Sequence, residues 1–286
     1  MTELKLLIRN MTADELVLAL KWALAEGWNP GLNDAALFYR ADPNGFFVGE
    51  LEGEIVAVGS AVTYGKDFAF CGLYIVAPEH RGKGYGLALT KHRLAYCGER
   101  NVGIDGVLEN VEIYQRIGYQ PYYQNRRYQK LASYRSQSIE AITVLDNNVS
   151  STELNTINLY DRQCFPANRE TFLKAWMTQS DGLTLVYRSE GKISGYLVRR
   201  PCIEGYKVGP LFADNADIAG VLLNQAQSGI EGETLILDVP ENNPAAVALA
   251  EREDMQVVFA TVRMYQKGMP NIDNGKIFGI TTFELG

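Results

Sequence analysis

The spacing of hydrophobic residues in the first 132 positions changes between the period of strands and the period of helices. Thr12-Ala-Asp-Glu15 has the spacing of a capping box and precedes apolar residues at helical intervals, which predicts a helix ending near Gly27. Runs rich in β-branched and aromatic residues, separated by turn residues, predict strands. The expected strands cover 4–9, 46–51, 55–64, 68–76, 102–107 and 119–131, and further helices cover 33–40, 87–97 and 110–117.

The order of these elements is repeated in the second part of the chain. A turn at Glu190-Gly191-Lys192 between two expected strands mirrors the turn at Gly53, about 138 positions earlier. The remaining expected elements are a helix from 151, helices over 168–177, 218–226 and 244–252, and strands over 183–188, 193–200, 206–212, 234–239, 256–265 and 277–285. A repeat of this length predicts two similar domains rather than a solenoid, whose units span roughly 20–50 residues.

The repeat predicts an α/β (α+β) architecture of two tandem domains, each a mixed and mostly antiparallel sheet flanked by helices. The first domain is expected over 1–132 and the second over 151–286, with a polar, serine-containing linker over 133–150. The 286 residues suffice for two domains that each bury a core. Basic residues near the linker are expected on a solvated strand face. They are Arg126, Arg127, Lys130 and Arg135.

Composition and charge are typical of a globular protein and argue against a nucleic-acid-binding or membrane-spanning one. The chain has 47% apolar and 21% charged residues, as soluble globular proteins do. Its 27 Lys and Arg against 34 Asp and Glu give a net charge of -7, which argues against a general nucleic-acid binder. No apolar run approaches the ~18 residues of a membrane helix, and the first residues do not resemble a signal peptide. Four widely spaced cysteines form no zinc motif, so we expect no metal and a cytoplasmic location.

The most informative segment is a glycine-rich turn between an expected strand and an expected helix, Arg81-Gly-Lys-Gly-Tyr-Gly86. Backbone amides at a helix N-terminus bind anions, and glycine lets them approach a phosphate closely. The turn lacks the Gly-Lys-Ser/Thr of a P-loop, and Leu87 stands where the dinucleotide-binding pattern needs Gly or Ala. It matches R-x-x-G-x-G instead, at Arg81, Gly84 and Gly86. An ordinary strand-to-helix turn, with glycines for tightness, is the alternative.

The segment Ile75-Val-Ala-Pro-Glu-His-Arg-Gly-Lys-Gly-Tyr-Gly86 closely resembles the acetyl-CoA loop of the GNAT superfamily of N-acetyltransferases. The order of elements around it resembles that fold over nearly the whole chain. Asp105-Gly-Val107 and the segment that follows it resemble the late strand and helix of the family, with Tyr114 at the position of the family's tyrosine. Trp28-Asn-Pro-Gly31 and Thr282-Phe-Glu-Leu-Gly286 are similar to the two-domain (tandem GNAT) proteins of the YitH/HolE group.

This resemblance implies an N-acetyltransferase with acetyl-CoA as cosubstrate. The pyrophosphate is expected on the amides from Gly82 to Leu87 with Arg81 as a helper, and the pantetheine beside Leu73–Val76. The Val76 amide would polarise the thioester carbonyl, and Tyr114 would protonate the departing thiolate, unless it merely packs against the sheet. The expected cofactor-binding residues are Leu73, Tyr74, Ile75, Val76, Arg81, Gly82, Lys83, Gly84, Tyr85, Gly86 and Leu87.

The acceptor implied by the resemblance is a primary amine of a small molecule, which would attack the thioester directly in a ternary complex. Asp105 would hold or deprotonate an ammonium substrate, or else cap a turn. Trp28 and Asp238 are weaker candidates for the acceptor pocket. Two other functions remain open: a non-catalytic acyl-CoA-binding regulatory module, and an acetyltransferase for protein or peptide amines. We expect a monomer or a homodimer.

The second domain is expected to be a degenerate copy of the first. Gly209–Asp217 stands in the place of the glycine-rich loop but contains no R-x-x-G-x-G, and Asp214 would repel a pyrophosphate, as would Asp217. Ala250 stands where the first copy has Tyr114. We therefore expect the second domain to be catalytically silent and to help shape the acceptor pocket.

Overall fold

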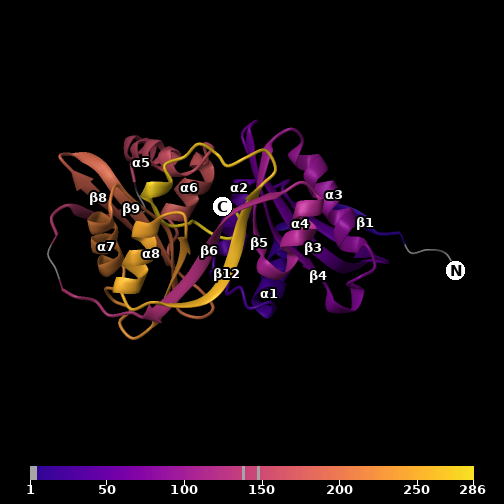
Figure 1. The fold of residues 1–286 in the computed structure, drawn as a ribbon, viewed down its shortest axis with the longest axis horizontal. Coiled ribbons are helices and arrows are strands. Elements are labelled where there is room, and N and C mark those ends of the chain that lie inside the picture. Colours follow the sequence, from indigo (N-terminus) through magenta and orange to yellow (C-terminus); the bar gives the residue numbers. More distant parts are fainter. Residues whose placement is uncertain (1–4, 137–138, 147–148) are drawn as a thin grey trace.

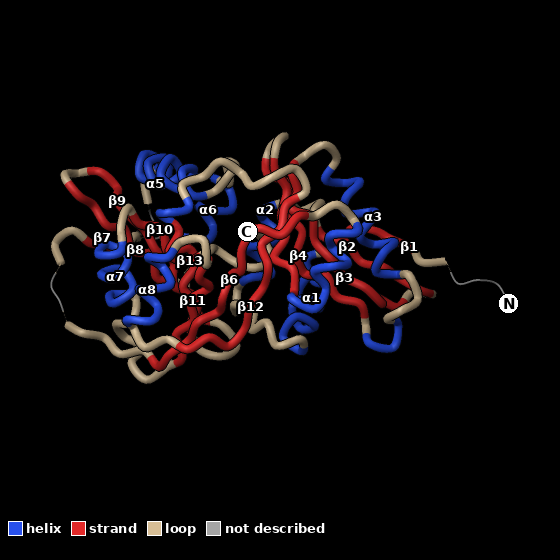
Figure 2. The backbone as a smooth tube through the Cα atoms, in the orientation of Figure 1, coloured by secondary structure: helices blue, strands red, loops and turns tan. Residues whose placement is uncertain are grey.

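The computed structural model describes residues 5–136, 139–146 and 149–286, and its elements follow the repeated order predicted from the sequence. The first half contains β1 (Leu7–Asn10), α1 (Ala13–Ala25), α2 (Asp34–Ala41), β2 (Phe46–Leu51), β3 (Glu54–Tyr64), β4 (Phe68–Val76), α3 (Tyr85–Cys97), β5 (Asn101–Val107), α4 (Val111–Arg116) and β6 (Gln120–Leu131). The second half contains β7 (Ile142–Val144), α5 (Ser151–Cys164), α6 (Glu170–Met177), β8 (Leu183–Ser189), β9 (Lys192–Pro201), β10 (Tyr206–Ala213), α7 (Ala216–Gln225), β11 (Thr234–Pro240), α8 (Pro244–Arg252), β12 (Gln256–Tyr265) and β13 (Ile277–Gly279). Helices flank the strands along the length of the molecule (Figures 1 and 2).

Within the described residues the strands form one continuous sheet. Its order is β1-β2-β3-β4-β5-β12-β6-β11-β10-β9-β8-β7, with β13 beside β10. Neighbouring strands are antiparallel except for two parallel pairs, β4 with β5 and β10 with β11. The predicted fold class, helices around a mixed and mostly antiparallel sheet, is therefore confirmed.

The two halves exchange their last long strands. β6 of the first half pairs with β11 of the second, and β12 of the second half pairs with β5 of the first. β6 and β12 also pair with each other, and in Figure 1 they run side by side across the middle of the molecule. The sequence did not predict this exchange, because the hydrophobic pattern of a strand shows which face is buried but does not name its neighbour.

Two buried ion pairs lie at matching places in the exchanged strands. Asp105 of β5 lies directly opposite Arg263 of β12, with 2.8 Å between Oδ2 and Nη2. Asp238 of β11 lies directly opposite Arg127 of β6, with 2.7 Å between Oδ1 and Nε. Each arginine makes two hydrogen bonds to its aspartate. The expectation of a solvated face is wrong for Arg127, which is buried because it balances a carboxylate that has lost its hydration.

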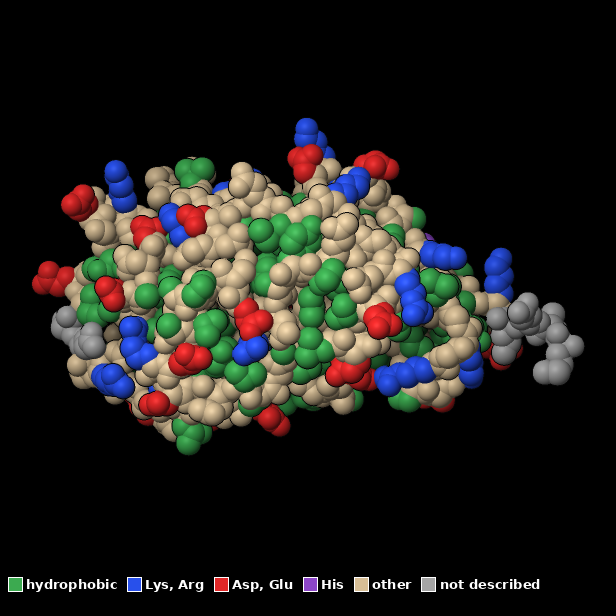
Figure 3. Space-filling model, viewed as in Figure 1, with side chains coloured by type: hydrophobic (Ala, Val, Ile, Leu, Met, Phe, Trp, Pro, Cys, Tyr) green, Lys and Arg blue, Asp and Glu red, His purple; other side chains and the backbone are tan. Residues whose placement is uncertain are grey.

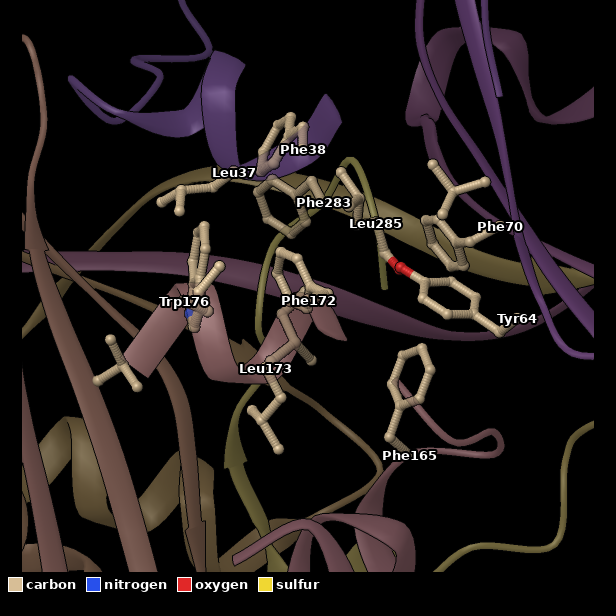
Figure 4. Packing of buried hydrophobic residues seen from close by; sticks show 14 of the residues in the cluster. Leu37, Phe38, Tyr64, Phe70, Phe165, Phe172, Leu173, Trp176, Phe283 and Leu285 are labelled. Carbon is tan, nitrogen blue, oxygen red and sulfur yellow. The ribbon is translucent and has the colours of Figure 1, made fainter. Parts of the chain in front are cut away.

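Apolar packing also joins the two halves. The largest buried cluster includes Phe38 from α2 and Trp176 from α6, whose rings stack with centroids 6.2 Å apart. Phe172 of α6 belongs to the same cluster. The end of the chain fills the space between the halves, and Figure 4 shows Phe283 and Leu285 among these side chains. This cluster, one of three in the described residues, therefore draws on both halves.

The last segment of the chain differs from the strand predicted over 277–285. β13 ends at Gly279, and the chain then turns because the Thr282 hydroxyl accepts hydrogen bonds from the amides of Glu284 and Leu285 at 3.1 and 2.9 Å. Alternating apolar residues predicted the strand, but here both kinds of position are buried between the two halves.

The expected linker also contains an unpredicted strand. β7 pairs with β8, as β1 pairs with β2 in the first half, so the repeat extends further than the sequence indicated. Position 4, where the first strand was expected to begin, lies outside the described residues, as do positions 137, 138, 147 and 148 of the linker. The domain boundaries themselves stay a prediction.

The surface mixes charges of both signs. On the face seen in Figure 3, Lys and Arg side chains are interspersed with Asp and Glu. None of the helices in the described ranges is long and apolar enough to cross a membrane. All four cysteines are free and buried.

The exchanged ion pairs predict a large effect of neutralising one partner. In Asp238→Asn, Arg127 keeps a buried charge without its counterion, so we expect a loss of about 3–5 kcal/mol in the free energy of unfolding. Urea denaturation measures it. Glu112→Gln is the control, since Glu112 and Arg116 form an exposed pair on α4, 3.6 Å apart, worth roughly 0.5 kcal/mol or less. A loss in Asp238→Asn no larger than in this control would contradict the role given to the pair.

Candidate active site

A cavity opens where β4 and β5 separate. The two strands pair only from Phe68 to Cys71, and Leu73 then takes a left-handed backbone conformation with φ of 45°. Beyond this point β4 continues beside β3 alone, so its edge toward β5 is uncovered. The cavity has a volume of about 660 Å³ and runs along this edge from Gly72 to Val76. A parting pair of parallel strands leaves backbone groups available to a ligand that lies between them.

The glycine-rich loop forms one end of this cavity. Gly82 and Gly84 have φ of 76° and 85°, and nothing lies within 4 Å of the place where either would carry a Cβ. The first hydrogen bond of α3 runs from the Ala88 amide to the Gly84 carbonyl. Among the described residues, the amides from 82 to 87 have no acceptor. An uncapped helix N-terminus with open glycines fits a pyrophosphate.

Arg81 lies beside the loop. Its Nε donates to the Val76 carbonyl at 2.9 Å, and its Nη2 lies 2.5 Å from a carboxylate oxygen of Glu26. The side chain is 51% exposed. Nine of the predicted cofactor-binding residues line the cavity, namely Leu73, Tyr74, Ile75, Val76, Arg81, Gly82, Gly84, Gly86 and Leu87. Lys83 and Tyr85 are not among its lining residues.

Tyr114 lines the cavity from α4. Its ring packs on β5 at Gly106, where an added Cβ would come within 2.6 Å of a ring carbon. Gly106 is therefore required for this placement, since any side chain there would push the ring away. Burial raises the pKa of Tyr114 above its usual value, so the phenol keeps its proton at neutral pH.

Asp105 also lines the cavity, but both of its carboxylate oxygens are engaged. Arg263 donates to each oxygen at 2.8 Å, and Asn125 adds a bond of 2.7 Å to Oδ1. These partners come from β12 and β6. The contacts favour a positioning role for Asp105 over a role as a turn cap, because its partners are side chains of neighbouring strands.

The second half supplies part of the cavity wall. Phe259 and Thr261 of β12 line the cavity, as do Phe283 and Glu284 of the tail. None of the four was predicted as a site residue, because Phe259 and Thr261 reach the cavity through the strand exchange, and Phe283 and Glu284 through the course of the tail after β13. Trp28 lines the same cavity, and its carbonyl accepts hydrogen bonds from the buried side chains of Arg127 and Lys207.

Asp238 was expected to face the acceptor region, but it is absent from the lining. Its carboxylate is taken up by Arg127, whose Nη1 donates to the Trp28 carbonyl at 2.9 Å. Lys207 donates to the same carbonyl at 3.0 Å. Asp238 therefore acts on the cavity indirectly. It fixes Arg127, and Arg127 in turn fixes the backbone carbonyl of Trp28.

The matching place in the second half is filled by the chain itself. β10 pairs with β11 over Tyr206–Val208, and β13 then pairs with β10 at Leu211 and Phe212. The start of α7 is capped, since the Asn215 side chain accepts from the amides at 217 and 218. The free amides and the open gap of the first half thus have no equivalent here.

A loop of free amides, a gap between two parting strands and a half-buried tyrosine therefore surround one cavity. Residues 13–119 match the model of the Acetyltransferase (GNAT) family, and residues 157–279 match that of an Acetyltransferase (GNAT) domain. The chain is 30% identical to the Holothin acyltransferase of a Pseudoalteromonas species, covering 96% of this chain and 92% of that protein. The chain belongs to the GNAT family and is an acyltransferase with two GNAT domains.

More distant relatives agree on the fold. YitH of Bacillus subtilis, an uncharacterized N-acetyltransferase, is 22% identical over 91% of each chain. The crystal structure of an acetyltransferase candidate from Pyrococcus horikoshii superposes with a TM-score of 0.83 at 20% identity, covering 100% of this chain and 99% of that one. A tandem GNAT protein from the clavulanic acid biosynthesis pathway superposes with a TM-score of 0.60 at 13% identity, covering 91% and 98%.

The loop geometry predicts the effect of a charge at Gly84. Gly84→Glu places a carboxylate beside the free amides, so we expect the Kd for acetyl-CoA to rise at least tenfold, about 1.4 kcal/mol. Isothermal titration calorimetry measures this. Gly191→Glu is the matched control, because Gly191 also has positive φ with open space around it but lies in the β8–β9 turn. Equal affinities in the two variants would contradict the assignment of the loop.

Proposed function

We propose that the chain is an acetyl-CoA-dependent N-acetyltransferase that transfers the acetyl group directly to a primary amine of a small molecule. One observation carries the proposal: four residues with free amides, Gly82, Gly84, Gly86 and Leu87, line the same cavity as the half-buried Tyr114. When bound, acetyl-CoA supplies an acyl thioester. The chain's own groups hold it, orient it and move protons around it.

The roles follow from the positions of the residues. The amides from Gly82 to Leu87 bind the pyrophosphate, aided by Arg81, and the uncovered edge of β4 pairs with the pantetheine. The Val76 amide polarises the thioester carbonyl. Tyr114 donates its proton to the CoA thiolate, a role supported by the raised pKa that keeps the phenol protonated. Asp105, bound by Arg263, positions the end of β5 beside the reacting groups.

We propose further that the first domain, 1–132, carries the cofactor site and that the second, 151–286, is a degenerate copy. The capped start of α7 and the insertion of β13 beside β10 support this division. The second domain retains a role, because β12 and the tail form one wall of the cavity. That wall also favours a small amine over a protein side chain as the acceptor.

The free cysteines support a reducing compartment, so we propose that the protein acts in the cytoplasm.

If Tyr114 is the general acid, replacing it should lower turnover without weakening the binding of acetyl-CoA. Tyr114→Phe removes the proton donor and keeps the ring on Gly106, so we expect kcat to fall roughly 10²–10⁴-fold at an unchanged Kd for acetyl-CoA. Release of CoA thiol against a panel of primary amines measures the rate. Tyr122→Phe on the exposed part of β6 is the control and keeps wild-type turnover. If kcat is unchanged in Tyr114→Phe, the acid is another group.

A further inference from the structure

Glu284 differs from three other buried acids that the structure describes. Asp34, Asp105 and Asp238 are each bound by an arginine at 2.7–2.8 Å. Across the part of the chain that the structure describes, no lysine or arginine lies within 4.0 Å of the Glu284 carboxylate, and no hydrogen-bond donor reaches it. The residue is 7% exposed and lines the cavity. A carboxylate withdrawn from water without a protein partner is available to a cationic ligand.

The backbone holds Glu284 in place. The Thr282 hydroxyl accepts from its amide at 3.1 Å, and the Tyr64 hydroxyl donates to the next carbonyl, that of Leu285, at 3.0 Å. Figure 4 shows Tyr64 with its hydroxyl turned toward Leu285. Glu284 also packs on Gly72 of β4, where an added Cβ would come within 2.8 Å of the Glu284 Cα. The carboxylate is therefore carried by a fixed backbone beside the strand edge that receives the thioester.

Charged groups from four elements face Glu284. Lys207 of β10, Arg127 of β6 and Arg200 of β9 lower its pKa, and Asp34 of α2 raises it. Both arginines are already paired with aspartates, and Lys207 donates to a carbonyl. Burial is the largest effect and raises the pKa of Glu284 above its usual value. A carboxylate with a raised pKa is a better proton acceptor than an exposed one.

We infer that Glu284 binds the ammonium group of the acceptor and then accepts its proton, so that the second half of the chain supplies the base of the reaction. This inference rests on the proposed function. Three aromatic residues, Trp28, Phe259 and Phe283, line the same cavity as Glu284. Phe283 is itself held in place, with the Arg127 guanidinium 4.8 Å from its ring centroid. A cavity lined by three aromatic residues and one unpaired carboxylate fits a primary ammonium carried on a flat, apolar body.

The proton steps balance. The carboxylate takes one proton from the ammonium and later releases it to solvent, which leaves a neutral amine. The amine nitrogen then forms a bond to the acetyl carbonyl carbon as the carbon–sulfur bond breaks. The CoA thiolate takes the phenol proton of Tyr114, and the second proton lost by the nitrogen returns to the phenolate. The products are an amide, CoA thiol and one proton in solution.

The test compares wild type with Glu284→Gln and Glu284→Asp. Acetyl-CoA is used with tryptamine, tyramine and spermidine from pH 5.5 to 9, and thiol release gives kcat and KM. In wild type, kcat/KM for the two aromatic amines falls as the pH drops through the Glu284 pKa, because the base becomes protonated. In Glu284→Gln we expect kcat/KM to fall at least 100-fold. The fall of kcat/KM at low pH, called the acid limb of the pH profile, should also disappear. Glu284→Asp retains the limb at a reduced rate.

Acetyl-CoA affinity, measured by calorimetry, stays within twofold of wild type in both variants and shows that they fold. Glu251→Gln on the exposed face of α8 is the control for loss of one negative charge. If Glu284 merely balances Lys207, Glu284→Gln changes stability but keeps the acid limb, which overturns the inference. If wild type acetylates spermidine but neither tryptamine nor tyramine, the inference that the acceptor is an aromatic amine is wrong. Failure of wild type to release thiol with any of the three amines contradicts the proposed function itself.

Discussion

Two reciprocal aspartate–arginine pairs hold the molecule in the form on which its site depends. Asp105 with Arg263 and Asp238 with Arg127 each join a strand of one half to a strand of the other at directly opposed positions. Desolvating four charges is costly, and the cost is offset only when both partners stay together in good geometry. The pairs therefore tie the folding of each half to that of the other. They also disfavour a slip in register, because moving either strand by one residue would leave two buried charges unpaired.

The segment after β12 explains why the described residues contain one candidate site of this kind rather than two. Both halves contain a parallel pair that begins to part, β4 with β5 and β10 with β11. In the first half the gap is the cavity, whereas in the second half β13 pairs with β10 near the point of parting. The chain then continues past β13 to the opposite wall of the first cavity, where it places Phe283 and Glu284. The same tail thus fills one gap and completes the other.

Local features of this fold were predictable from the sequence, and long-range ones were not. Periodicity and capping patterns predicted the order of elements, because they depend on neighbours a few residues apart. The loop at Arg81–Gly86 was recognisable because its chemistry lies in one continuous segment. The strand exchange depends on pairing between residues more than a hundred positions apart, so no local pattern reports it. Phe259 and Glu284 were missed for that reason, and Arg127 was misjudged because its partner Asp238 lies on another strand.

We propose that acetyl-CoA binds to the first half alone, while both halves build the cavity. Hydrogen–deuterium exchange with and without acetyl-CoA tests it most directly, because exchange reports protection peptide by peptide. On binding, we expect slower exchange at 73–76 and 82–90 and unchanged exchange at 213–220, the matching loop of the second half. Slower exchange at 213–220, or none at 82–90, would contradict it.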